Sequence, residues 1–151
     1  MKAYKTAVAM LLVLLFPPST SRSEPPVEVA VVINAANPMG SMTLDEVRSF
    51  YMKQKSSWPD GEKIRPVDTE TDDAARTLFL GKVLKTNPTD LERHWLEIKY
   101  RSAESPPKRM EDEAGVLKYV GAFKGGIGFV AVSALELAKD KPIKVVLKVK
   151  K

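Results

Sequence analysis

The sequence predicts an α/β fold whose sheet is mainly parallel and carries helices on both faces. Short β-branched runs alternate along the chain with segments of helical periodicity, which is the order found in sheets of this kind. The runs expected to form strands are residues 27–33, 63–67, 127–132 and 143–149. The first of them is almost wholly apolar, as is typical of a strand covered on both faces.

Start and stop signals place the helices between these strands. Thr43 with Glu46 three residues later makes a capping box. Pro88 suits a first helical position, and Gly125-Gly126 suits a helix end followed by close backbone packing. The expected helices begin at Thr43, run from the polar stretch 68–73 through Leu84, begin at Asn87-Pro88, span 112–123 and span 134–139.

Residues 1–23 have the features of a secretory signal peptide. Lys2 and Lys5 precede a short apolar run at 7–16, and small polar residues follow it. The apolar run has half of the roughly 20 residues that a membrane-spanning helix needs. We therefore expect cleavage after Ser23 or Ser21, a single periplasmic domain at 24–151, and no membrane span after removal of the signal.

Composition limits the chemistry that the chain can perform. The net charge of +5 falls to +2 when Lys2, Lys5 and Arg22 leave with the signal, which gives no reason to expect nucleic-acid binding. Without cysteine the chain has no disulfide, thiolate or Cys-based metal site. His94 is the only histidine, so no catalytic triad or His cluster can form, and we expect it to pack beside the buried face of its helix. The sequence thus predicts neither an enzyme, nor a metal site, nor a cofactor.

The order of several motifs resembles that of the phosphate-type (type II) periplasmic substrate-binding proteins. The segment 37–67, NPMGSMTLDEVRSFYMKQKSSWPDGEKIRPV, is similar to that family's Asn-Pro loop, capped helix, Trp and following strand. HWLEIKYRSAESPPKRM, at 94–110, resembles its Trp-containing helix and Pro-Pro loop. VGAFKGGIGFV, at 120–130, resembles its Gly-x-Ile-Gly-Tyr strand entry.

The resemblance implies about one lobe of a protein that normally holds its ligand between two lobes, and short single-lobe members of this kind occur. It also implies an oxyanion site built from an Arg and a Ser-Gly-Thr at a helix N-terminus. Aligned without gaps on Phe79, the Arg falls at Thr69 and the Ser-Gly-Thr at Asp73-Ala74-Ala75, where a carboxylate replaces the hydroxyls. The candidate ligand-binding residues are Thr69, Thr71 and Arg76.

Other charged segments have simpler interpretations. The acidic run of Asp68, Glu70, Asp72 and Asp73 has neither the Gly nor the Glu that a calcium loop needs at its sixth and twelfth positions, so we expect a solvated loop that caps a helix. The C-terminal lysines, Lys144 and Lys148 among them, are typical of an edge strand protected from pairing with other chains. Lys108-Arg109 is expected to be a solvated loop.

The expected function is that of a periplasmic solute-binding-protein-like module for phosphate or another small oxyanion, in uptake by an ABC-type transporter or in sensing. The alternative is an envelope interaction module that kept the fold, lost the ligand site and docks another protein. The expected partners are accordingly a small oxyanion, and a membrane transporter or another envelope protein.

Overall fold

The computed structural model describes Ser23 and residues 25–151, so the predicted signal peptide lies outside the described residues apart from Ser23. No helix within the described residues is long and apolar enough to cross a membrane. In chain order the elements are β1 (Glu28–Asn34), α1 (Leu44–Tyr51), β2 (Arg65–Thr69), α2 (Ala74–Leu78), the π-helical η1 (Phe79–Leu84), α3 (Pro88–Ser102), β3 (Lys108–Met110), α4 (Glu113–Ala122), β4 (Gly126–Ala131), the 3-10 helix η2 (Val132–Ala138) and β5 (Ile143–Lys150).

The five strands form one sheet in the order β3-β2-β4-β1-β5. β2 pairs in parallel with β3 and β4, whereas β1 pairs antiparallel with both β4 and β5. Four strands therefore run in one direction and β1 alone runs in the other, which confirms the mainly parallel sheet. β5 lies at one edge, as its lysines predicted, and β3 lies at the other edge.

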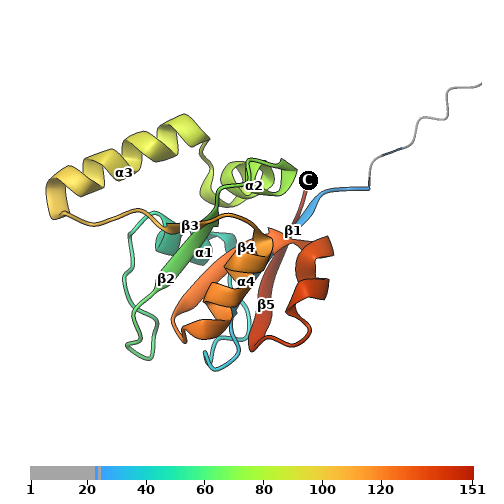
Figure 1. Cartoon of the computed structure of the whole chain (residues 1–151). Coiled ribbons are helices and arrows are strands. Elements are labelled where there is room, and N and C mark those ends of the chain that lie inside the picture. Colours follow the sequence, from blue (N-terminus) through green and yellow to red (C-terminus); the bar gives the residue numbers. More distant parts are fainter. Residues whose placement is uncertain (1–22, 24) are drawn as a thin grey trace, which may run out of the picture.

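Helices cover both faces of the sheet, as expected. One core gathers the β1 side chains Val29, Val31 and Ile33 with residues of α1, α2 and η1. The other core packs Val32 of β1 against α4 and η2. Figure 1 shows α4 in front of the sheet and α1 behind it. β1 is thus buried on both faces, in agreement with its apolar sequence.

Local signals in the sequence are confirmed at several element ends. Thr43 and Glu46 form the predicted capping box. Gly125 packs so closely that a Cβ there would lie 1.9 Å from the carbonyl oxygen of Lys63. The helix expected to continue through Leu84 instead changes from α2 into the π-helical η1, and Lys85 ends it with a φ of 52°.

Two expectations about polar segments are wrong. Lys108 and Arg109 are exposed as expected, but they do not form a loop, because with Met110 they make strand β3 beside β2. Asp68 is not solvated either, since it is 8% exposed at the buried end of β2. The backbone partners of β3 come from a distant part of the chain, and Asp68 is buried by its pairing with Arg76 across the turn after β2, so local polarity predicted neither.

α3 stands apart from the rest of the molecule (Figure 1). Asn87 caps its first turn, Pro88 occupies the first helical position, and Ala103 ends it with a φ of 55°. Trp95 is the one buried side chain of this helix. Leu96 and Tyr100, one turn apart, remain 53% and 84% exposed. Figure 1 and these exposures together describe an arm that rests on the body through Trp95 and the partly buried Leu91.

Candidate functional site

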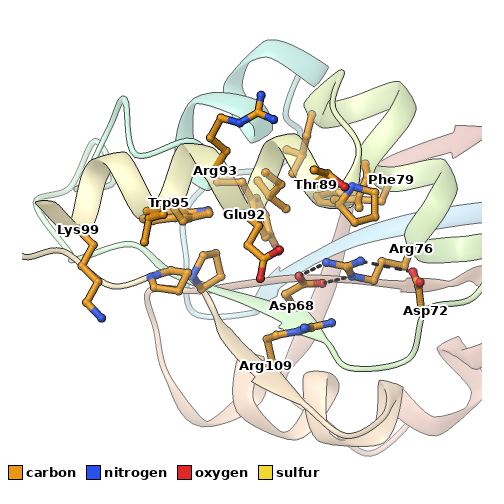
Figure 2. A pocket seen from close by; sticks show the side chains of 18 residues that line it. Asp68, Asp72, Arg76, Phe79, Thr89, Glu92, Arg93, Trp95, Lys99 and Arg109 are labelled. Carbon is orange, nitrogen blue, oxygen red and sulfur yellow. Dashed lines mark hydrogen bonds and ion pairs between the residues drawn. The ribbon is translucent and has the colours of Figure 1, made fainter.

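Arg76 lies where β2 ends and α2 begins, in an ion pair with Asp68. Its Nε and Nη2 donate to the two carboxylate oxygens of Asp68 at 3.1 and 2.9 Å. Its Nη1 donates to Asp72 at 3.4 Å. The Arg76 and Asp68 side chains are only 7% and 11% exposed. This two-bond geometry is the strong form of an arginine–carboxylate contact, and Figure 2 shows the guanidinium held between the two carboxylates.

The electrostatics of this pair favour the charged form of Arg76. The hydrogen bond to Asp68 raises the pKa of Arg76 above its ordinary value. The N-terminus of α2 is occupied as well, because Asp73 caps it by accepting from the backbone N–H of Arg76 at 2.9 Å. Carboxylates from this chain therefore take both the arginine and the helix N-terminus that an oxyanion would use.

Thr69 and Thr71 lie beside this pair but face elsewhere. Thr69 is 3% exposed, and its hydroxyl oxygen accepts from the backbone N–H of Thr71 at 3.1 Å. The Thr71 hydroxyl donates to the carbonyl oxygen of Glu111 at 3.1 Å. Both hydroxyls thus help shape the turn after β2. Of the three candidate residues, Arg76 lines the cleft described next, and Thr69 and Thr71 do not.

That cavity is a cleft of about 870 Å³ between α3 and the body of the domain. Figure 2 shows Trp95, Glu92 and Lys99 of α3 on one side, with Arg109 and the Asp68–Arg76 pair on the other. Its walls are mainly apolar and come from η1, α3 and the Pro-Pro loop: Phe79, Leu80, Leu84, Pro88, Leu91, Trp95, Leu96, Pro106 and Pro107. Charged side chains line it at one end and along α3, and the arrangement suits a partner with a large apolar surface.

The floor of the cleft consists of buried, closely packed aromatic rings. Tyr51 donates its hydroxyl to the carbonyl oxygen of Val67 at 2.8 Å, and burial raises its pKa well above the ordinary value, so it stays neutral. Phe79 stacks on Phe129 with ring centroids 3.8 Å apart and packs edge-on against Tyr51. Aromatic contacts of this kind hold the floor in one arrangement.

A second hollow, of about 330 Å³, adjoins the cleft, because Trp95, Pro106 and Pro107 line both cavities. It is lined by five cationic residues and one carboxylate: Lys53, Lys55, Lys63, Arg65 and Lys108, with Glu104. Sequence reasoning missed this group because its members come from three separate segments. Four of the five cations lie at 53–65, where they outnumber the two acidic residues, whereas Lys108 carries no such signal.

The cations of this lysine pocket are held in different ways. Lys53 pairs with Glu104 at 3.1 Å. Arg65 lies 4.9 Å from the ring centre of Phe123, and Lys108 lies 5.8 Å from that of Tyr119. An aromatic ring positions a cation without cancelling its charge. The pocket therefore keeps an excess of positive charge.

The described residues contain no group of three acidic or histidine side chains placed to hold a metal ion. The Nε2 of His94 lies 3.2 Å from the carbonyl oxygen of Met52, so the ring joins α3 to the end of α1. His94 is half-buried, as its helical position predicted.

Comparisons with known proteins bear on the fold. No protein-family model matches the sequence, and no match was found among curated proteins. Solved structures with a similar fold include a putative phosphate ABC transporter substrate-binding protein with bound phosphate from Clostridium perfringens (14% identity, TM-score 0.61), an ABC-type phosphate transport receptor from Vibrio cholerae (18%, 0.57) and PstS from Borrelia burgdorferi (6%, 0.62).

Each match covers 80% of this chain but only 44–47% of the other protein. Identities this low carry the fold and not the ligand. The resemblance expected from the motif order is therefore confirmed for the fold: this chain is built like a little under half of a phosphate-type substrate-binding protein.

Proposed function

We propose that this chain is a non-catalytic binding module of the periplasm that docks another protein in the cleft beneath α3. The observation that carries the proposal is the closed Asp68–Arg76 pair beside an open, mainly apolar cleft. The module keeps the substrate-binding-protein fold, but Arg76, the arginine among the candidate ligand-binding residues, is held in an ion pair with Asp68 of the same chain.

Free energy argues against phosphate at Arg76. A phosphate there has to displace Asp68 and leave its carboxylate buried without a partner, and breaking such a pair costs about 3–5 kcal/mol. Asp72 and Asp73 would add repulsion to any bound dianion, because both carboxylates already face Arg76. Phosphate binding in the manner of the resembling family therefore needs a compensating cation for Asp68, and Arg109, which Figure 2 shows beside Asp68, already donates to the carbonyl oxygen of Thr69.

The chemistry of the cleft favours a protein partner. Its apolar wall continues onto α3 at Leu96, one turn from the exposed Tyr100. An apolar centre with aromatic and arginine side chains and a charged rim is the usual composition of a protein interface. A helix lying in a groove is one common way to fill such a surface.

The proposed location follows from residues 1–23 and from the fold. A chain exported through a cleavable signal peptide would meet its partner beyond the inner membrane. A membrane transporter or another envelope protein is the partner class that this location offers. The proposal includes no catalytic step, because neither His94 nor Tyr51 is free to act as a base at the cleft.

The docking proposal can be tested by site-specific photo-crosslinking in cells that produce the full chain. A photoreactive residue at position 96 is expected to give protein adducts. The matched control is position 137, because Leu137 is 51% exposed and Leu96 is 53% exposed. Equal yields at the two positions, or no adduct at position 96, would contradict docking in the cleft.

The lysine pocket supports a second candidate function, the binding of a small oxyanion. Its excess of positive charge over Glu104 is the observation that favours it. Titration with phosphate in a calorimeter should then give heat that is lost in a Lys55→Gln/Lys63→Gln variant. Lys148→Gln/Lys150→Gln, on the edge strand β5, makes the same change of charge elsewhere and should retain binding.

A further inference from the structure

The contacts that α3 makes within one chain explain only part of its stability. The helix has 15 residues and one buried side chain, Trp95, while Leu91 packs against the core but stays partly exposed. Isolated helices of about this length are marginal in water, and most helices in proteins gain their stability from a packed apolar face. Leu96 and Tyr100 instead remain exposed. A partner that covers this face would supply the missing contacts.

The ion pairs of α3 indicate what that partner offers. The helix carries six acidic or basic side chains: Asp90, Glu92, Arg93, Glu97, Lys99 and Arg101. Four of them pair within the helix, as Arg93 with Asp90 and Arg101 with Glu97. Within the described residues Glu92 and Lys99 have no ion pair, and both line the cleft.

The spacing of these two charges is self-complementary. They are seven residues apart, which is two helical turns or about 10 Å along the axis, too far for an ion pair with each other. Glu92 lies three residues before Trp95, and Lys99 lies three residues after Leu96. Two antiparallel copies that cross midway between Trp95 and Leu96 would place each Glu92 beside the partner's Lys99.

We infer that the protein docked beneath α3 is a second copy of this chain, with the two α3 helices packed antiparallel about a twofold axis. This inference rests on the proposed docking function and names its partner. The exposed Leu96 side chains of the two copies meet at the centre of this arrangement, and two equivalent Glu92–Lys99 pairs form, because a twofold interface uses the same surface on both copies. Each copy also covers part of the other's open cleft.

The test is the mass of the purified protein in solution, measured by sedimentation over a series of concentrations. The expected result is a mass twice that of one chain at the higher concentrations. Leu96→Asp should abolish the dimer, because it puts a carboxylate into each half of the apolar centre. Leu137→Asp, at a similarly exposed position, should leave the dimer intact.

Exchanging the two charges distinguishes the proposed Glu92–Lys99 pairing from nonspecific hydrophobic association. Glu92→Lys and Lys99→Glu should each weaken the dimer roughly tenfold, because each places like charges together at both pairs. The double variant Glu92→Lys/Lys99→Glu restores opposite charges and should recover the dimer. Thermal melts check that each variant is folded.

A wild-type chain that stays monomeric throughout, or a double variant as weak as the single variants, would overturn the second-copy inference. Neither result decides the docking proposal, which is tested separately by the photo-crosslinking at position 96. Adducts with other proteins at position 96 would support docking while rejecting a second copy, and the absence of adducts would reject docking itself.

Discussion

The end of β2 and the arm formed by α3 differ in whether their charged and apolar side chains have partners within the chain. At the end of β2, Asp68 and Arg76 satisfy each other in a buried two-bond pair. On α3, Glu92 and Lys99 have no ion pair within the described residues, and Leu96 is exposed beside them. The two regions face each other across one cleft.

The difference indicates which region is free to bind. A buried pair that is broken by a ligand costs free energy, whereas an exposed apolar side chain releases about 25 cal/mol for each Å² that a partner covers. A fold shared with binding proteins therefore does not by itself identify the binding surface. In this chain the closed region contributes to stability, and the open region offers contacts to a partner.

The largest contrast should appear when one apolar side chain is shortened on each side of the cleft. Phe79→Ala removes a fully buried ring that stacks on Phe129, and should cost about 3–5 kcal/mol in the free energy of unfolding. Leu96→Ala in the monomer should cost less than about 0.5 kcal/mol. Chemical denaturation measures both values, and equal costs would mean that the arm is packed as tightly as the core.

A second contrast compares two arginines. Arg76→Ala leaves Asp68 buried without its cation and should cost about 3 kcal/mol, near the low end for such pairs because the cleft admits water. Arg93→Ala breaks an exposed pair with Asp90 on α3 and should cost less than about 1 kcal/mol. Denaturation curves at neutral pH test this, and an Arg76 variant as mild as the Arg93 variant would refute a stabilising role for the closed pair.

A smaller effect is expected at Glu113, a half-buried carboxylate in the first turn of α4. Burial raises its pKa, although its hydrogen bond from the backbone N–H of Ala131 acts in the opposite direction. A raised pKa means that the folded state binds more protons than the unfolded state, so this group's contribution to stability is lost as pH rises through the folded pKa.

Glu113→Gln removes that titration and keeps an oxygen that can accept from Ala131. We expect the variant to lose less stability than the wild type when the pH rises from about 4 to 7. Melting temperatures over this range measure the difference. A larger loss in the variant would show that the charged form of Glu113 is the stabilising one.

The parts of the fold that depend on local pattern could be predicted from the sequence. The apolar run in β1 predicted a strand buried on both faces, and Thr43 with Glu46 predicted the start of α1. β3 could not be predicted, because Lys108 and Arg109 carry no strand pattern and are held by backbone pairing with β2.

The candidate site, too, could be predicted from the sequence only in part. Asp68 and Arg76 were both noticed as charged residues, but their pairing depends on the turn between β2 and α2. The cleft depends on the direction of α3, which leaves the body at Lys85 and returns after Ala103, two residues with positive φ. Neither is a glycine, so the usual sequence signal for such a backbone was missing.

The central claim is that the end of β2 is closed to phosphate, and the most direct test is a thermal melt of the Lys55→Gln/Lys63→Gln variant with and without phosphate. The variant removes the lysine pocket as a competing site and leaves Asp68 and Arg76 unchanged. Phosphate bound at Arg76 would stabilise the fold by about 2.7 kcal/mol at 100 times its dissociation constant, a shift on the order of 10 °C for a domain of this size. We predict no resolvable shift at millimolar phosphate, and a shift on the order of 10 °C would contradict the closure of this site.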